Sequence, residues 1–320
     1  MNTDVHAISP VTVVIPCRTE HRWTSLRHAV ESARAQVPAP AEIVVVVDHN
    51  AALYEKARHE LPGVTVLANR FRRGAAGARD TGAFHAITPL IAFLDDDVRA
   101  HHGWLAALLT PFADRAVTGT GGAILPAWSG RRPAWFPDEL LWTVGATDPA
   151  KPAAPTAEVR SAAMAVRRET FIAVGGFGNR DDSAPYGGPA ERPGARDAAL
   201  CRRMAEAGGL WIFVPDARVH HPVTPERMTM RHLLRRCFHA GRIAARSGRG
   251  PLRAVLPGTP ARPLRALLRG GAPGALRRAG AVAAGATAAA AGGVLELTTR
   301  PPAPRPVPVQ TQKVTAGVRR

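Results

Sequence analysis

The stretch LIAFLDDDV, residues 90–98, decides the fold. Its first five residues are all apolar, as expected of a strand buried on both faces of a parallel sheet. Three aspartates, Asp95, Asp96 and Asp97, follow where that strand ends. Ligands of open α/β sheets bind beyond the carboxyl ends of the strands. The stretch therefore predicts an α/β protein with a polar site at the end of this strand.

Similar apolar runs lie upstream, and each is followed by a helical pattern. VTVVIP at residues 11–16 and IVVVV at 43–47 are predicted strands, and residues 64–67 form a shorter one. Helices are predicted over residues 24–36, 51–61, 75–86 and 104–112. This alternation predicts a Rossmann-like, doubly wound and mostly parallel sheet. The polar residues 18–20 and 48–50 also follow strands, so we expect them to meet Asp95–Asp97 in one site.

The pattern changes over residues 118–217, where glycine and proline interrupt the apolar positions. A strand over 162–166, a helix over 168–174, a Gly175-Gly176-Phe177 turn, a helix over 197–207 and a strand over 210–214 are predicted. We interpret this half as an extension of the same domain, on the side where a second substrate, the acceptor, would bind.

Charge divides the 320-residue chain into two parts. Residues 1–217 hold 23 basic and 23 acidic side chains, whereas residues 218–320 hold 19 basic and 2 acidic ones, which accounts for the net charge of +17. A uniformly basic nucleic-acid binder is thereby excluded, and Phe238 is the only aromatic residue of the basic part, so base stacking has little support. Residues 225–246 predict an amphipathic helix with arginines along one side, which is typical of a membrane surface. A solvated arginine face on a helix that packs on the preceding domain is the alternative.

Three further segments bear on location. Residues 279–295 carry no charge, but their alanine and glycine content favours a helix packed on protein or at a membrane surface over a spanning one. Three widely spaced cysteines suggest neither a disulfide framework nor a zinc site, and the first residues lack signal-peptide features, so we expect a cytoplasmic protein. Residues 300–320 are predicted to be disordered.

The acidic segment carries the sharpest chemical signal. Neighbouring carboxylates repel one another, and Mg²⁺ or Mn²⁺, which prefer oxygen ligands, would compensate them. Asp95 and Asp97 point to the same side of an extended segment. A solvated acidic turn is the alternative.

Two weaker signals support a nucleotide site. GAAGARDTG, residues 74–82, opens a helix whose N-terminus favours anions, and Arg79 is placed to pair with a diphosphate. The segment lacks the Gly-Lys-Ser/Thr of a P-loop. Asp48, after its strand, is suited to accept hydrogen bonds from a ribose or base, although a helix N-cap or turn role is equally compatible.

Together these segments resemble the family 2 glycosyltransferases, which have the GT-A fold and bind nucleotide sugars. The resemblance covers residues 10–240, and actinobacterial members are similar through VVVVDHN and RRPAWFPDELLW. It is carried by VTVVIPCRTE (11–20), EIVVVVDHN (42–50), GAAGARDTG (74–82), FLDDDV (93–98), RRETFIAVGGF (167–177) and ARDAALCRRM (195–204).

The resemblance implies a role for individual residues. It places Pro16, Arg18, Glu20 and Asp48 along the nucleotide pocket, Arg79 beside the diphosphate, and Asp95 and Asp96 against the nucleotide sugar. Asp97, Asp95 and His221 would ligate the divalent metal, Mn²⁺ or Mg²⁺, and Asp197 would be the catalytic base of an inverting transfer. An ordinary, partly buried histidine is the alternative for His221, and a helix N-cap is the alternative for Asp197.

Three positions depart from the family pattern. Arg196 replaces the first acid of the usual pair, Ala199 replaces an acid two residues beyond the base, and Asp80 stands where asparagine is common. A relative that binds nucleotide sugar without turnover, or with altered specificity, is therefore the alternative to an active hexosyltransferase-like enzyme. Trp128, Trp135 and Trp142 are candidates for sugar stacking or for core packing.

The resemblance also implies partners and boundaries. The donor is by default a UDP-sugar, and the acceptor is a hydroxyl of a glycan, a lipid-linked molecule or a secondary metabolite, as in the synthesis of cell-envelope polysaccharides. We expect no nucleic acid, and we expect peripheral contact with the anionic inner face of the plasma membrane. The predicted boundaries are a tail over 1–9, a GT-A domain over 10–224, a basic helical extension over 225–299 and a tail over 300–320.

Overall fold

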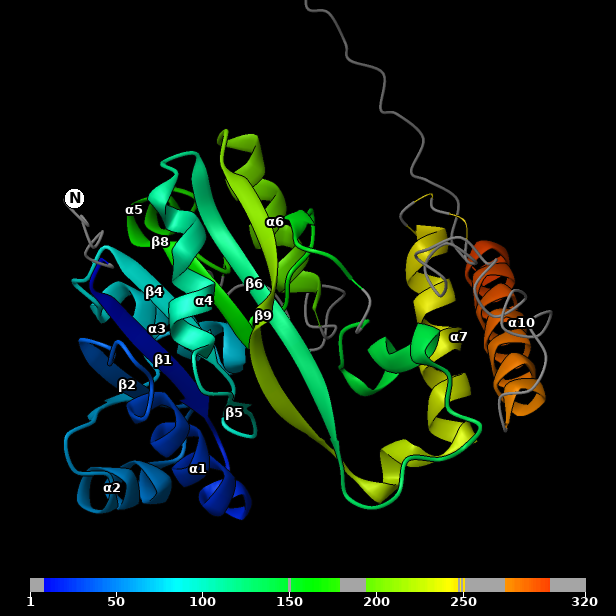
Figure 1. The fold of residues 1–320 in the computed structure, drawn as a ribbon, viewed down its shortest axis with the longest axis horizontal. Coiled ribbons are helices and arrows are strands. Elements are labelled where there is room, and N and C mark those ends of the chain that lie inside the picture. The colour runs from blue at the N-terminus through cyan, green and yellow to red at the C-terminus, as the bar shows by residue number, and fades with distance from the viewer. Residues whose placement is uncertain are drawn as a thin grey trace, which may run out of the picture.

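The computed structural model describes residues 9–148, 151–178, 194–246, 248, 250 and 274–299. In these ranges, one mixed sheet lies between helices on both of its faces (Figure 1). The strands follow the order β3-β2-β1-β4-β8-β6-β9-β5, and β7 pairs with β9. Their bounds are β1 Val11–Cys17, β2 Glu42–Val47, β3 Thr65–Ala68, β4 Leu90–Leu94, β5 Arg99–Ala100, β6 Val117–Trp128, β7 Ala154–Pro155, β8 Ala163–Arg167 and β9 Leu210–Val223.

The helices connect and cover these strands. The α-helices are α1 Trp23–Arg34, α2 Ala51–Glu60, α3 Ala75–His85, α4 Trp104–Leu109, α5 Arg168–Ala173, α6 Ala195–Glu206, α7 Met230–Arg246 and α10 Ala275–Thr299. Short 3-10 turns are η1 Glu20–Arg22, η2 Thr110–Ala113, η3 Asp138–Val144 and η5 Pro225–Met228.

The N-terminal half confirms the predicted parallel sheet. β1 pairs in parallel with β2 and β4, and β2 pairs in parallel with β3. Successive residues of β1 enter different cores: Val13 and Ile15 join the cluster that includes Leu26 of α1, whereas Val14 joins the cluster that includes Ala78 of α3. Because side chains alternate across a strand, a continuous valine-rich run serves both cores.

The second half joins the sheet through strands that the sequence pattern describes poorly. β8 lies antiparallel between β4 and β6, and β6 runs parallel to β9. Glycines of β6 make room for large neighbours: a Cβ on Gly119 would lie 2.4 Å from the Trp211 ring, and one on Gly121 would lie 2.2 Å from Val159. The strand predicted over 210–214 is too short, because β9 continues to Val223 across a register shift.

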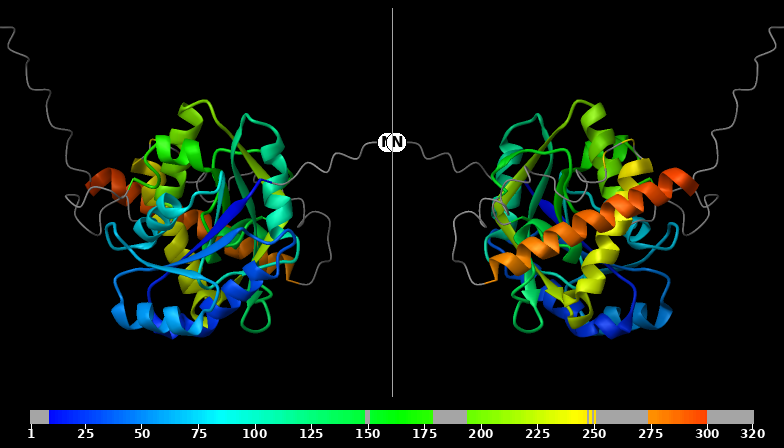
Figure 2. Two further views of the ribbon diagram at one scale, coloured as in Figure 1. Left: turned by 90° about the vertical axis from the view of Figure 1, so that its left-hand side faces the viewer. Right: turned by 90° about the vertical axis from the view of Figure 1, so that its right-hand side faces the viewer.

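α7 and α10 form a pair beside the sheet (Figures 1 and 2). A third apolar cluster joins them to η3, with Leu140 of η3, Leu233 and Cys237 of α7, and Val282 and Ala289 of α10. The helices approach at glycines, since a Cβ on Gly241 would lie 1.9 Å from the carbonyl oxygen of Ala289.

The charge-free stretch at 279–295 lies within α10. By length and composition, α10 is the one helix among the described residues that is long and apolar enough to cross a membrane. Its alanines and glycines pack on α7, and Glu296 Oε2 pairs with Arg242 Nε across the two helices at 2.9 Å. The described residues therefore fit the expected helix packed on protein. Of the tails predicted over 1–9 and 300–320, residues 1–8 and 300–320 lie outside the described residues.

Candidate active site

The candidate site lies where β1, β2 and β4 end, as the alternating pattern predicted. Asp48 follows β2, the aspartates at 95–97 follow β4, and Arg18 and Glu20 follow β1. Arg18 and Glu20 are exposed, whereas Pro16 is a buried residue of β1 paired with Val46.

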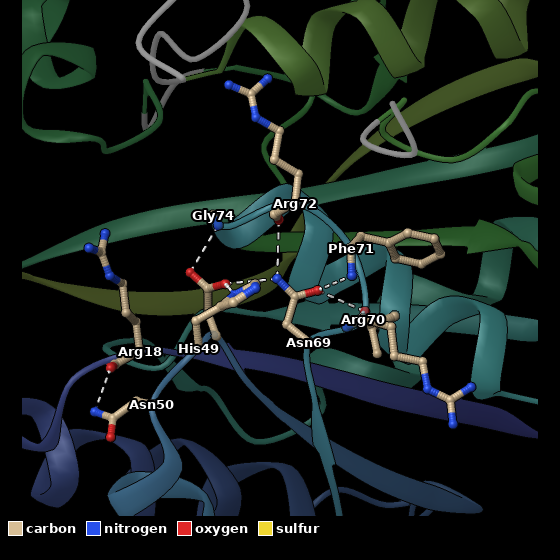
Figure 3. A network of polar contacts seen from close by, with 10 residues as sticks. Arg18, His49, Asn50, Asn69, Arg70, Phe71, Arg72 and Gly74 are labelled. Atoms are coloured by element: carbon tan, nitrogen blue, oxygen red, sulfur yellow. Dashed lines mark hydrogen bonds and ion pairs between the residues drawn. The ribbon is translucent and has the colours of Figure 1, made fainter. Parts of the chain in front are cut away.

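Asp48 holds the loop that leads into α3. Its Oδ1 accepts a hydrogen bond from Asn69 Nδ2 at 2.7 Å and lies 2.8 Å from His49 Nδ1, and its Oδ2 accepts from the Gly74 N–H at 2.9 Å. Gly74 has a φ of 126°, which glycine adopts without strain. Figure 3 shows His49, Asn69 and Gly74 in this network. Asp48, which is 2% exposed, therefore fixes where α3 begins.

Asn69 extends the network, and sequence reasoning missed it. Its Oδ1 accepts from the Phe71 N–H at 3.0 Å and from Thr81 Oγ1 at 2.9 Å (Figure 3). The Asn69 backbone N–H also bonds to the Val47 carbonyl. An amide directly after a short strand was the available signal, but its partners come from α3 and could not be read from spacing.

Arg79 is the central cation of the site. It lies on the buried face of α3, is 8% exposed, and pairs through Nη2 with Asp95 Oδ1. Burial opposes the charged guanidinium, but the carboxylates of Asp95, Asp197 and Asp96 outweigh burial and raise the pKa of Arg79. The predicted diphosphate ligand and the predicted base, which come from distant parts of the chain, therefore lie within electrostatic reach of each other.

Asp96 and Asp97 share a cation that sequence reasoning did not identify. Arg22 Nη1 lies 2.9 Å from Asp96 Oδ1 and 3.1 Å from Asp97 Oδ2. Burial, reinforced by the neighbouring carboxylates, raises the pKa of Asp96 to about 6, although Arg22 opposes the increase. Arg22 stands at the end of η1, just before α1, so no local spacing links it to the acidic segment.

His221 lies beside Asp97. Its Nε2 is 4.0 Å from Asp97 Oδ2, and its Nδ1 is a buried atom without a hydrogen-bond partner among the described residues. Burial lowers the pKa of His221, the attraction of Asp97 opposes this, and Arg227 adds to the lowering. The imidazole is therefore biased to the neutral form that ligates metals.

The acidic segment and His221 fit a divalent ion in part. Within the described ranges, no three His, Cys, Asp or Glu side chains are already gathered around one point, and Asp95 is turned towards Arg79. Asp97 Oδ2 and His221 Nε2 lie 4.0 Å apart, so these two side chains would be the protein's ligands to a divalent ion. Such an ion would supply positive charge beside a bound diphosphate.

Asp197 lies in the first turn of α6, but it is not the cap of that helix. The N-cap residue is Gly194, and Asp197 Oδ2 accepts the backbone N–H of Ser161 at 3.1 Å. Among the described residues, the other carboxylate oxygen, Oδ1, makes no hydrogen bond. Asp197 is 8% exposed, so it is oriented by Ser161 and retains one oxygen for a proton.

The three departures from the family pattern lie close together. Asp80 Oδ1 accepts the Phe177 N–H at 2.8 Å and thereby holds the Gly175-Gly176-Phe177 turn. Arg196 Nη1 lies 3.4 Å from the Gly178 carbonyl oxygen. Ala199 lies on the same helix as Asp197.

The three tryptophans, Trp128, Trp135 and Trp142, pack in a different apolar cluster. Trp128 and Trp135 pack on Phe136, at ring separations of 5.3 and 5.4 Å, and all three tryptophans contact the cluster that joins η3 to α7 and α10. This arrangement favours core packing over sugar stacking.

Solved structures share this architecture. A mannosyltransferase from Pyrobaculum calidifontis in complex with GDP-Man and Mn²⁺ superposes with a TM-score of 0.53 and 21% identity, covering 90% of this chain and 87% of that one. GalNAc-T7 with UDP, GalNAc and Mn²⁺ gives the same score and identity over 69% of this chain and 44% of its own. The GT-A fold expected from the sequence is confirmed.

Curated relatives extend the comparison. A glucosyl-dolichyl phosphate glucuronosyltransferase of Haloferax volcanii is 29% identical over 72% of this chain and 75% of its own. A pre-mycofactocin glycosyltransferase of Mycobacterium tuberculosis is 31% identical over 75% of this chain, which spans about half (48%) of that relative. The model of glycosyl transferase family 2 matches residues 12–174, which include the strand ends and the acidic segment. The chain therefore belongs to glycosyl transferase family 2.

Proposed function

We propose that the chain moves a sugar from a nucleoside diphosphate donor to an acceptor hydroxyl, with inversion, and that Asp197 is the base. The observation that carries the proposal is the meeting of Asp95, Arg79 and Asp197 in one site. Family membership supports the donor class, and a UDP-sugar is the first candidate.

The residues divide the reaction between them. Asp197 Oδ1 takes the acceptor proton while the acceptor oxygen bonds to the anomeric carbon, and the bond from that carbon to the diphosphate oxygen breaks. Arg79 is placed to neutralise the charge that the departing diphosphate gains. Asp97 and His221 would hold Mn²⁺ or Mg²⁺, which supplies further charge neutralisation when bound. Asp48 keeps the start of α3, and with it Arg79, in position.

The acceptor proposal is a lipid-linked or glycan hydroxyl. The Haloferax volcanii relative, by its name, acts on glucosyl-dolichyl phosphate, which supports a lipid-linked acceptor. The basic C-terminal part supports placement at the cytoplasmic face of a membrane, because Arg231 and Arg235 are exposed on α7 and Leu276, Val294 and Leu297 are exposed on α10. Arginines beside apolar side chains suit an anionic lipid surface. Co-sedimentation with anionic vesicles at physiological salt tests this, and no binding would contradict it.

Thermal stabilisation by nucleotide sugars with and without Mn²⁺ tests the donor site. We expect Asp97→Ala to abolish the Mn²⁺-dependent stabilisation and Asp216→Asn, at an exposed aspartate that pairs with Arg218, to retain it. Asp197→Asn should keep donor binding and lose transfer, with the anomeric configuration of the wild-type product read by NMR. Undiminished transfer by Asp197→Asn would refute the assigned base, and donor binding without transfer by the wild type would favour the non-catalytic alternative.

A further inference from the structure

Two arginines from other segments, Arg160 and Arg227, lie within electrostatic reach of Arg236. Arg160 precedes β8, Arg227 lies in η5 and Arg236 lies in α7; we refer to them as the arginine cluster. Burial, followed by the fields of Arg160, Arg227 and the neighbouring Arg235, lowers the pKa of Arg236. The positive charges of Arg160, Arg227 and Arg235 are therefore close enough to destabilise the protonated guanidinium of Arg236.

Within the described residues, the arginine cluster has no acidic partner. No acidic side chain in the described part of the chain forms an ion pair with Arg160, Arg227 or Arg236, and Arg236 Nε is buried without a hydrogen-bond partner there. By contrast, Arg242, six residues further along α7, pairs with Glu296 at 2.9 Å. A buried donor without a partner is costly, and natural structures seldom keep one unless a ligand or water satisfies it.

The position of the cluster links it to the proposed reaction. Arg160 adjoins Ser161, whose N–H holds Asp197, and its guanidinium lies over the start of α6, where a Cβ on Gly194 would be 1.7 Å from Arg160 Nη1. Arg227 acts on His221, which lies beside Asp97. The cluster therefore adjoins the base, but it comes from segments outside β1, β2 and α3, which carry Arg79 and Asp48.

We propose that the arginine cluster binds a phosphate group carried by the acceptor. Guanidinium groups from separate segments suit an anion with several oxygens, because each can donate paired hydrogen bonds to a phosphate. This inference rests on the proposed function, because it assigns the acceptor a phosphate at a distance from the hydroxyl that reacts. The phosphate can belong to a lipid-linked acceptor or to a soluble phosphate ester.

Calorimetric titration of the full chain with geranyl phosphate and with ethyl phosphate tests the proposal, both with and without UDP and Mn²⁺. We expect both ligands to bind the wild type and the control Arg27→Gln, at an exposed arginine of α1 that pairs with Glu31. We expect Arg236→Gln, and Arg160→Gln at an exposed arginine, to bind both phosphates at least about tenfold more weakly. This factor corresponds to the loss of one charged hydrogen bond. Tighter binding of geranyl phosphate identifies a lipid source, and equal binding identifies a soluble ester.

Equal affinity in all variants would overturn the proposal. It would also be overturned if Arg160→Gln and Arg236→Gln weakened UDP binding and left phosphate binding unchanged, because the cluster would then serve the donor. Circular dichroism of each variant controls for folding, and Arg160, being exposed, provides a test even if the Arg236 variant unfolds. A wild type that binds no nucleotide with Mn²⁺ would instead contradict the proposed function, and the titrations without UDP separate the two outcomes.

Discussion

Gly82→Ala tests whether the seating of α3 on the sheet positions Arg79. A Cβ at Gly82 would lie 2.5 Å from Val14 Cγ1 and 3.1 Å from Val46 Cγ2, closer than packed atoms allow. Both valines belong to fully buried strands, so neither has space to move. The helix must therefore shift away from β1 and β2.

The size of the effect follows from two opposing contributions. Replacing glycine by alanine inside a helix favours folding by about 1 kcal/mol. Overpacking a dense core costs about 1–3 kcal/mol, so a net loss of about 1 kcal/mol is expected. Gly280→Ala is the matched control, because Gly280 lies in α10 and a Cβ added there would have no neighbouring atom within 4 Å. This control should gain about 1 kcal/mol.

Urea denaturation measures the change in stability, and calorimetric titration with UDP and Mn²⁺ measures the change in nucleotide affinity. Arg79 lies one turn before Gly82, so a shift of α3 would move Arg79 relative to a bound nucleotide. We expect nucleotide binding to weaken about fivefold. This equals about 1 kcal/mol, a part of the free energy that one charged hydrogen bond contributes. A stability gain equal to that of Gly280→Ala would refute the tight seating. Lower stability with unchanged nucleotide affinity would refute the link to Arg79.

Three further predictions address the surrounding contacts. Asp80→Ala should cost about 1–3 kcal/mol in urea denaturation, because the buried Phe177 N–H loses its acceptor, and Asp80→Asn should cost less; equal losses would contradict this role. Burial raises the pKa of Cys201 and of Cys237 to about 11. Both thiols should therefore stay protonated at about pH 8.5 and react with iodoacetamide only after unfolding. Rapid labelling of the native protein would contradict this. Arg22→Gln should tighten Mn²⁺ binding, because it removes a cation that competes for the carboxylates of Asp96 and Asp97. Electron paramagnetic resonance of the free ion measures this binding, and weaker binding would show that Arg22 supports the metal site.

The parallel half and its polar strand ends were predictable because local patterns determine them. A valine run buried on both faces has few alternatives, and carboxyl ends of neighbouring parallel strands meet at one edge, which brought Asp48 and the acidic segment together. β6 was not predictable, because its glycines are explained only by Trp211 and Val159, which arrive from other segments.

The same limit applies to the site. Resemblance to a family pointed to Arg79 and Asp197, and the structure brings them to one place. Arg22 and Asn69 belong to no spacing pattern, since their partners are fixed by the tertiary fold alone. The pairing of Asp95 with Arg79 was equally beyond sequence patterns, because it depends on where α3 packs on the sheet.

The separate apolar cluster of η3, α7 and α10 has an evolutionary consequence. Its members are distinct from the two clusters that flank the sheet, so substitutions there can accumulate without repacking the valines beneath the nucleotide site. Selection can thus diversify one side of the molecule while conserving the other. A single continuous strand, β9, carries His221 and ends at Val223, a member of this cluster, so changes in the packing of α7 can reach the candidate site through only a few residues.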